Sequence, residues 1–272
     1  MWWFRRGLCA LPVALVIWSS GTLLLSYAIA VALGHADLIV PYISDTGTDV
    51  PERCVFGFML SISAFLGLGT MYVRYKQVQA LVLASESGLQ LINYTALLLG
   101  IFSSVGMCVV ANFQKTDIIS AHLLGAGLTF GPGMLYILIQ IGISYRMQPR
   151  FHGKYILGSR MAVGIWSLIS IITLSISSVL MYDALPDVDV AKKVHWQPGE
   201  NGFIAHLASA VSEWSLAFSF ISFFLTYIPD FQKINLRVQT ILQSNRLHDY
   251  PDYEGRDCMQ HDERSPLLAG AV

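Results

Sequence analysis

Long apolar runs without a charged side chain constrain this sequence more than any other feature. A helix needs roughly 20 residues to cross a hydrocarbon core about 30 Å thick. Five runs are long enough and contain no Lys, Arg, Asp or Glu, and a sixth is interrupted only by Glu213. The six runs cover residues 7–34, 54–73, 87–114, 118–145, 161–182 and 201–229. Lipid offers no partner for backbone N–H and C=O groups, so the sequence predicts an all-α membrane protein with a six-transmembrane-helix bundle.

The runs define one membrane domain, residues 1–229, followed by a polar tail. The spans are expected at about residues 8–33, 55–73, 92–112, 119–143, 161–182 and 204–228. The first run exceeds the roughly 7–15 apolar residues of a cleaved signal peptide, which favours a retained anchor. Residues 230–272 have the composition of a disordered cytosolic tail.

Basic residues orient the bundle, because cytosolic loops carry an excess of Lys and Arg. Six spans leave both termini on one side, and 13 of the 17 Lys and Arg residues fall on that side. The remaining four are Arg53, Lys115, Lys192 and Lys193. Both termini are therefore expected to be cytosolic. This places the sequon at Asn93 at a cytosolic helix end, where no glycan is added.

Composition and motifs exclude several functions. The formal net charge is −1, so the chain lacks the basic excess of nucleic-acid-binding proteins. The four cysteines are far apart without CxxC spacing, and no GxSxG, P-loop or dinucleotide-binding glycine motif occurs. We therefore expect no metal, no cofactor and no nucleic-acid partner, and the chain is not expected to be an enzyme.

One group of ionisable residues keeps an alternative open. Glu213 lies about ten residues into the sixth span, roughly 15 Å deep, where an ionisable side chain marks a candidate functional site. His206 precedes it by two turns, and His122 begins the fourth span near the same side. The three could form a proton relay or a metal-assisted hydrolase site, but a structural polar network is favoured.

Glycines in the fourth span predict a close helix crossing. Gly127 and Gly131 lie one turn apart, so a neighbouring helix is expected to pack against this pair.

The tail ends in a candidate sorting signal. Glu263 stands before the pair Leu267 and Leu268, which resembles an acidic dileucine signal. Clathrin-adaptor complexes read such a signal as an extended peptide. The alternative is a chance pair of leucines.

A string in the loop after the first span identifies a family resemblance. Residues 41–48 read PYISDTGT, and further matching stretches include YVRYKQVQAL from Tyr72, SEWSLAFSF from Ser212 and YIPDFQKINLRV from Tyr227. These residues resemble the damage-regulated autophagy modulator (DRAM) family, most closely its second member. The resemblance implies a six-span lysosomal membrane protein that promotes autophagy and is linked to stress-induced cell death. The resemblance assigns no catalytic residues to this chain.

The family motif itself predicts local structure. Its members are Pro41, Tyr42, Ile43, Ser44, Asp45, Thr46 and Gly47. Asp and Ser side chains in such a string bond nearby backbone N–H groups, so a turn that fixes the lumenal mouth of the bundle is favoured over a ligand or ion contact.

Two function hypotheses follow. The first is a non-enzymatic regulator of autophagy whose partners are membrane lipids, adaptor complexes and autophagy or lysosomal membrane proteins. Late endosome, Golgi and photoreceptor-type apical membranes stay open as locations beside the lysosome. The second is an intramembrane lipid-modifying enzyme or small transporter that uses His122, His206 and Glu213.

Overall fold

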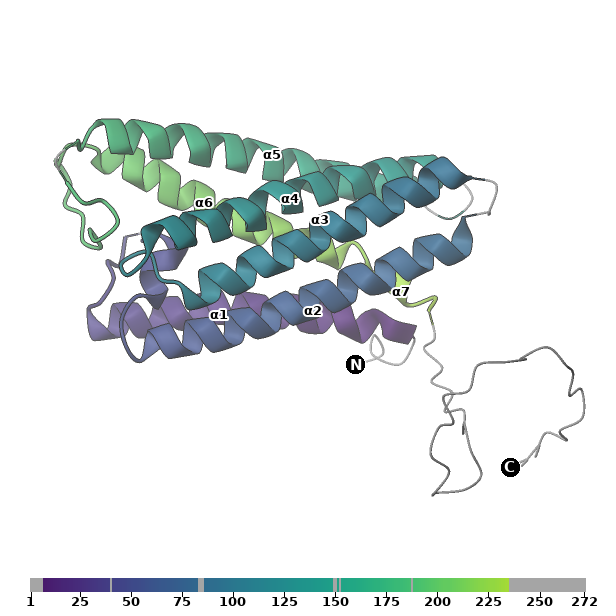
Figure 1. Ribbon diagram of the computed structural model, residues 1–272, viewed down its shortest axis with the longest axis horizontal. Helices are drawn as coiled ribbons and strands as arrows, with labels where there is room; N and C mark the ends of the chain where they lie inside the picture. The colour runs from purple at the N-terminus through teal and green to yellow at the C-terminus, as the bar shows by residue number, and fades with distance from the viewer. Residues whose placement is uncertain are drawn as a thin grey trace, which may run out of the picture. The chain divides into compact units, whose positions relative to one another are not determined.

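The computed structural model describes residues 7–39, 41–82, 86–148, 151, 153–186 and 188–234. Six stretches are helical, long and apolar enough to cross a membrane, and no strand occurs in these described ranges (Figure 1). The helices are α1 (Ala10–Leu33), α2 (Glu52–Leu81), α3 (Ser87–Asn112), α4 (Ile119–Arg146), α5 (Lys154–Asp183) and α6 (Phe203–Leu225), and the short α7 (Ile228–Phe231) follows α6. The predicted six-helix membrane bundle is confirmed.

Several helices extend beyond their apolar runs. The run at 54–73 lies within α2, which continues to Leu81, and α5 begins at Lys154 rather than near residue 161. Hydrogen bonding along a helix does not stop at the edge of the hydrocarbon, so a helix can continue beyond its apolar run. The apolar pattern therefore locates each span but underestimates the length of the helix.

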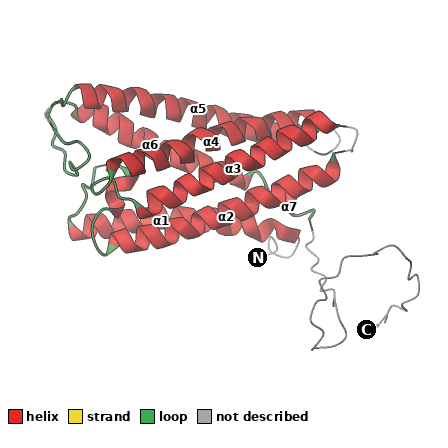
Figure 2. Cartoon of the chain, viewed as in Figure 1, coloured by secondary structure: helices red, strands yellow, loops and turns green. Residues whose placement is uncertain are grey.

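The helices pack as a ring. Each of α1 to α6 contacts the next along the chain, and α6 returns to contact α1. Figure 2 shows the loops α1–α2, α3–α4 and α5–α6 gathered at one end of the bundle. We call this the capped end; its loops span residues 34–51, 113–118 and 184–202.

Close packing between α3 and α4 uses different glycines from those expected. A Cβ on Gly106 would lie 2.6 Å from the Thr129 backbone nitrogen, and one on Gly125 would lie 2.9 Å from Val109 Cγ1. A Cβ on Gly127 or Gly131 would meet nothing within 4 Å, so the predicted crossing at that pair is wrong. Two positions along a helix correspond to about 200° around it, so Gly127 faces away from the contact that Gly125 makes.

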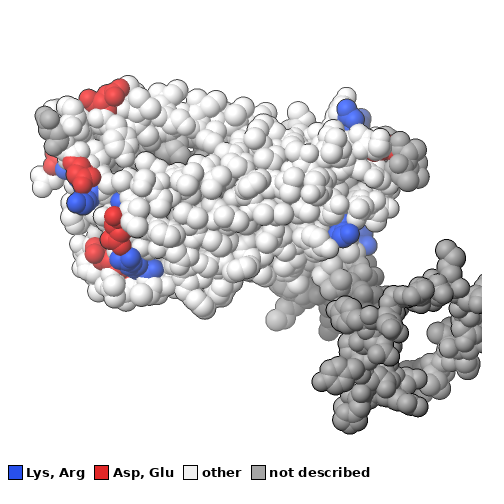
Figure 3. Space-filling model, viewed as in Figure 1, with Lys and Arg blue, Asp and Glu red and all other residues white. Residues whose placement is uncertain are grey.

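On the face of the bundle drawn in Figure 3, charged side chains lie at the two ends, with an uncharged belt between them. Packing also continues past the expected domain end at residue 229, because Asp230 and Phe231 are buried. The Leu8 backbone N–H donates to the Ile234 carbonyl at 3.0 Å, which ties the start of the bundle to its end.

Candidate functional site

Polar side-chain contacts hold the loops of the capped end together. Arg53 at the start of α2 contacts Asp117 in the α3–α4 loop at 2.6 Å. Asp37 after α1 contacts His195 in the α5–α6 loop at 2.8 Å, and it also accepts from the Trp196 backbone N–H. Each contact joins loops that are far apart in the chain, so the loops form one layer over the bundle.

The family motif is buried beneath this layer. Residues 43–47 form the 3-10 helix η3 (Ile43–Gly47), in which Ile43, Asp45, Thr46 and Gly47 are buried. Asp45 Oδ2 accepts from the Tyr42 backbone N–H at 3.2 Å, as a motif turn requires. Ser44 instead lines a cavity inside the bundle. The motif is a plug in the mouth of the bundle, and its backbone is fixed by its own side chains.

Helix α6 holds the first three residues of the motif. Three consecutive motif residues are hydrogen-bonded to it: Trp214 Nε1 donates to the Pro41 carbonyl at 2.8 Å, Tyr42 Oη donates to Ser209 Oγ at 2.8 Å, and the Ile43 N–H donates to Glu213 Oε2 at 2.8 Å. Ser209 lies about one turn before the adjacent Glu213 and Trp214, so the three partners face the plug together. Glu213 therefore receives a backbone amide from the motif.

Asp45 links the plug to the α3–α4 loop. Its carboxylate forms an ion pair with Lys115, and both side chains are buried. Burial raises the pKa of the Asp45 carboxyl above its ordinary value, while Lys115 and the Tyr42 backbone amide oppose that rise. The Lys115 ammonium also lies 5.4 Å from the Tyr42 ring centre, and burial raises the pKa of the Tyr42 hydroxyl.

Gly47 lets the plug approach α2. A Cβ at this position would lie 2.6 Å from the Phe56 ring. A larger residue would push the plug away from α2 unless the ring moved.

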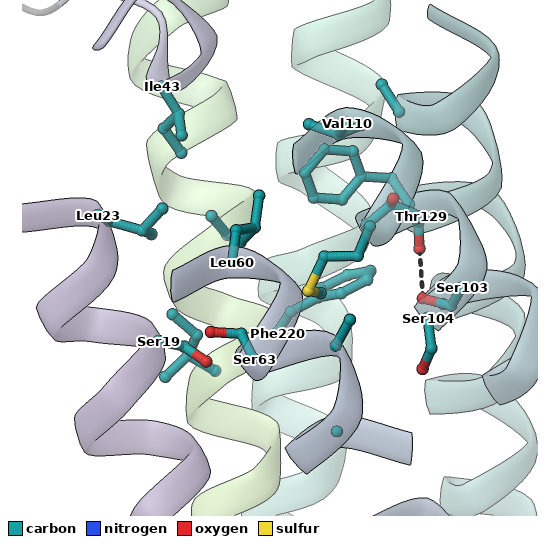
Figure 4. Close-up of a pocket in the computed structure, with 18 of the residues that line it drawn as sticks. Ser19, Leu23, Ile43, Leu60, Ser63, Ser103, Ser104, Val110, Thr129 and Phe220 are labelled. Carbon is teal, nitrogen blue, oxygen red and sulfur yellow. Dashed lines mark hydrogen bonds between the residues drawn. The ribbon is translucent and has the colours of Figure 1, made fainter. Parts of the chain in front are cut away.

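A cavity of about 140 Å³ lies in the bundle below the plug. Its walls come from η3 and from helices α1, α2, α3, α4 and α6, and most of them are apolar. Figure 4 shows Ser103 donating to the Thr129 carbonyl on one wall, with Leu23, Leu60 and Phe220 among the apolar residues around it. Apolar cavities of about this size, roughly 150 Å³, stay dry and accept small hydrophobic groups.

The three ionisable residues proposed from the sequence have different surroundings. His122 and Glu213 both line the cavity. His122 Nδ1 bonds the Phe113 carbonyl at 2.8 Å, which fixes the turn into α4. His206 stacks on Trp196 with ring centres 4.1 Å apart and meets the Tyr42 ring edge-on. In the described ranges, none of the three is hydrogen-bonded to another.

The opposite end of the bundle buries a charge cluster that the sequence did not predict. Arg74 of α2 and Arg160 of α5 both contact Asp230 Oδ2 in α7, at 3.1 and 2.5 Å. Both guanidinium groups are fully buried, and they lie 5.4 and 5.0 Å from the Tyr227 ring centre. We call this the arginine end. The positive-inside count treated Arg74 and Arg160 as flanking cytosolic charges, whereas the structure packs them inside the bundle.

Sequence signals for these contacts were weak. Asp230 directly follows Pro229, which reads as the end of a span rather than as a buried acid. Asn93 of the sequon is also buried and donates to the Tyr75 carbonyl at 2.9 Å. Glu263, Leu267 and Leu268 lie outside the described residues.

Comparison with known proteins identifies the family of this chain. Residues 7–234 match the model of the Frag1/DRAM/Sfk1/Cwh43P N-terminal domain. The chain belongs to this family. The family resemblance of residues 41–48 is thereby confirmed.

Relatives named as autophagy modulators match this chain over half to nearly all of its length. DNA damage-regulated autophagy modulator protein 2 from Homo sapiens is 46% identical over 269 residues, covering 99% of each chain. DNA damage-regulated autophagy modulator protein 1 from Homo sapiens is 40% identical over 87% of this chain and 96% of its own length. The Xenopus laevis modulator of macroautophagy TMEM150B-A is 34% identical over 54% of this chain. No solved structure matches.

Proposed function

We propose that this chain is a lysosomal multi-pass membrane protein that promotes autophagy, is linked to stress-induced cell death and acts without catalysis. One observation carries the proposal: proteins named as autophagy modulators are 45–46% identical to it over essentially the full length. Six helices long and apolar enough to cross a membrane support the multi-pass part of this proposal.

Orientation and delivery form the second part of the proposal. The arginine end and both termini face the cytosol, and the capped end faces the lumen. Adaptor complexes read Glu263, Leu267 and Leu268 in the cytosol and direct the protein to the lysosome. The sequence count supports this orientation, since 13 of the 17 Lys and Arg residues fall on the side of the termini.

The plug supports a contact function rather than a reaction centre. Glu213 accepts a hydrogen bond from the Ile43 backbone N–H, and His122 is hydrogen-bonded to the Phe113 carbonyl. Both side chains therefore hold the structure together in this conformation. The partners proposed are membrane lipids and other autophagy or lysosomal membrane proteins. The apolar cavity below the plug has room for a small hydrophobic part of a lipid.

A lipid-modifying enzyme or small transporter is the second candidate. The observation that favours it is that His122 and Glu213 line the same cavity in the middle of the bundle. His206 adds little to such a site, because its ring is held between Trp196 and Tyr42.

Complementation of cells that lack the protein separates the two candidates. Glu213→Gln keeps an oxygen for the Ile43 amide but removes the titratable charge, so autophagic flux should stay at the wild-type level. Leu267→Ala with Leu268→Ala should move the protein away from lysosomes and abolish flux. Ser265→Ala lies between the acid and the leucines and serves as the matched tail control, with normal location expected.

Two results would contradict the proposal. Loss of flux in Glu213→Gln, with folding and lysosomal location intact, would favour the enzyme or transporter. Normal lysosomal location of the double leucine variant would remove the delivery route.

A further inference from the structure

Three potential metal ligands meet at the capped end, beside the plug. His35 follows α1, Asp49 lies between η3 and α2, and Glu52 is the first residue of α2. One ligand atom from each lies within 4.8 Å of the other two. His35 Nδ1 and Glu52 Oε1 are 2.5 Å apart. The backbone fixes this geometry, because Gly34 ends α1 with φ 75° and the Arg53 N–H donates to the Asp49 carbonyl at 2.7 Å.

A second observation shows that the cluster is not satisfied by the protein alone. The Glu52 side chain is 0% exposed, and its Oε2 has no hydrogen-bond partner in the described ranges. A buried carboxylate oxygen without a partner is costly, and folded proteins rarely leave one. The oxygen without a partner belongs to the same Glu52 carboxylate that contacts His35. An ion bound beside His35 would therefore also meet Glu52.

The surrounding charges do not supply the missing partner. Every Lys and Arg in the capped end contacts an acid outside the cluster: Arg53 contacts Asp117, Lys115 contacts Asp45, Lys192 contacts Asp189 and Lys193 contacts Glu200. The cluster itself holds two carboxylates and one imidazole. Acidic side chains therefore outnumber the imidazole in the cluster, which suits a bound cation.

We propose that His35, Asp49 and Glu52 form a binding site for a divalent transition-metal ion, with Zn²⁺ as the ion it fits best. An imidazole nitrogen and two carboxylate oxygens are ligands that Zn²⁺ accepts at about 2.0–2.2 Å, with a water molecule in the fourth position. Ca²⁺ prefers sites made only of oxygen ligands, so the imidazole selects against it. The ion replaces the contact between His35 Nδ1 and Glu52 Oε1, and the neutral imidazole then carries its proton on Nε2.

The ion would close the loop that carries the family motif. Residues 41–47 lie between His35 and Asp49 in the chain, so one ion joins both ends of the plug to the start of α2. The site is a property of the folded protein, and it needs neither the proposed location nor the proposed role in autophagy. No local sequence spacing announces it, because His35 is separated from the two acids by the whole plug.

Direct titration tests the site. The full-length protein is purified in detergent, treated with a chelator and titrated with Co²⁺, whose visible absorption reports imidazole and carboxylate ligation, and with Zn²⁺ in competition. We expect saturable binding of one ion, displacement of Co²⁺ by Zn²⁺ and a higher melting temperature with Zn²⁺. Excess Ca²⁺ should not compete.

Matched variants locate the ion. Asp49→Asn is exposed and should fold, yet it should weaken Zn²⁺ binding by at least about tenfold, the loss that even an outer partner of a ligand produces. His35→Gln should do the same. Asp189→Asn removes an exposed acid from another capped-end loop, and Cys54→Ser removes the nearest thiol in sequence; both should bind as the wild type does.

Three outcomes would overturn the proposal. The first is that the folded wild type binds no ion at saturation. The second is that Asp49→Asn and His35→Gln both bind as tightly as the wild type. The third is that Ca²⁺ displaces Co²⁺ as effectively as Zn²⁺ does, which would contradict ligation by the imidazole.

Discussion

The two ends of the bundle bury charge in opposite ways. The capped end uses many separate contacts between loops and α6, such as the pairs Asp45 with Lys115 and Glu213 with the Ile43 amide. The arginine end uses one carboxylate, Asp230, as the shared partner of Arg74 and Arg160. Loss of one contact should therefore be tolerated at the capped end and should be severe at the arginine end.

Asp230→Ala should produce the largest effect. It leaves two buried guanidinium groups without their shared carboxylate, and breaking a buried ion pair in this way costs about 3–5 kcal/mol. The free energy of unfolding of the purified protein in detergent is the measurement. Asp189→Ala removes an exposed acid and should change stability by less than about 1 kcal/mol. Equal effects of the two variants would remove the contrast between the ends.

Gly47→Ala should come next. The new methyl group would lie 2.6 Å from the Phe56 ring, and forcing extra volume into a packed site costs about 1–3 kcal/mol. Gly127→Ala is the matched control, because a Cβ there meets nothing within 4 Å and helical alanine is preferred over glycine. Thermal unfolding of both variants is compared, and a Gly47→Ala protein as stable as the control would show that the plug does not pack tightly against α2.

Asp45 should give the capped end a pH dependence. Burial raises its pKa in the folded state, with Asp37 adding to the rise and with Lys115 and the Tyr42 amide opposing it. The folded state then holds the proton more tightly than the unfolded state. The stability from this group is full below the ordinary value, about 3.9, and is lost as the pH rises through the folded pKa.

The melting temperature measured against pH tests this sign. From about pH 4 upward, the wild type should lose more stability than Asp45→Asn, which cannot titrate. Identical profiles, or a wild-type stability that rises relative to the variant over this range, would contradict the assignment.

Trp214→Phe should have the smallest effect. It removes the hydrogen bond to the Pro41 carbonyl, with an expected cost of about 1 kcal/mol. Faster hydrogen exchange at residues 41–47 is the measurement. Trp166→Phe also loses an indole bond, to Ser215, but lies away from the plug and should leave this exchange unchanged.

The sequence predicted the helices better than the contacts between them. Charge-free runs identify membrane helices because lipid imposes the same requirement on every span, and all six were found. Which side of each helix packs against a neighbour was harder to predict, as Gly127 and Gly131 show. Apolar residues surround a lipid-facing helix on all sides, so its packed side does not stand out. The Ile43 amide at Glu213, the Lys115 ammonium at Asp45 and the two arginines at Asp230 could not be predicted, since each lies in a segment distant along the chain and no local pattern links them.

Labelling of single cysteines in intact lysosomes tests the central claim that the two ends face two compartments. In a chain without native cysteines, Lys154→Cys at the start of α5 should react with a membrane-impermeant maleimide at once. Asp189→Cys in the capped end should react only after detergent opens the membrane. Immediate labelling at residue 189, with protection at residue 154, would contradict the proposed orientation and the delivery by the tail.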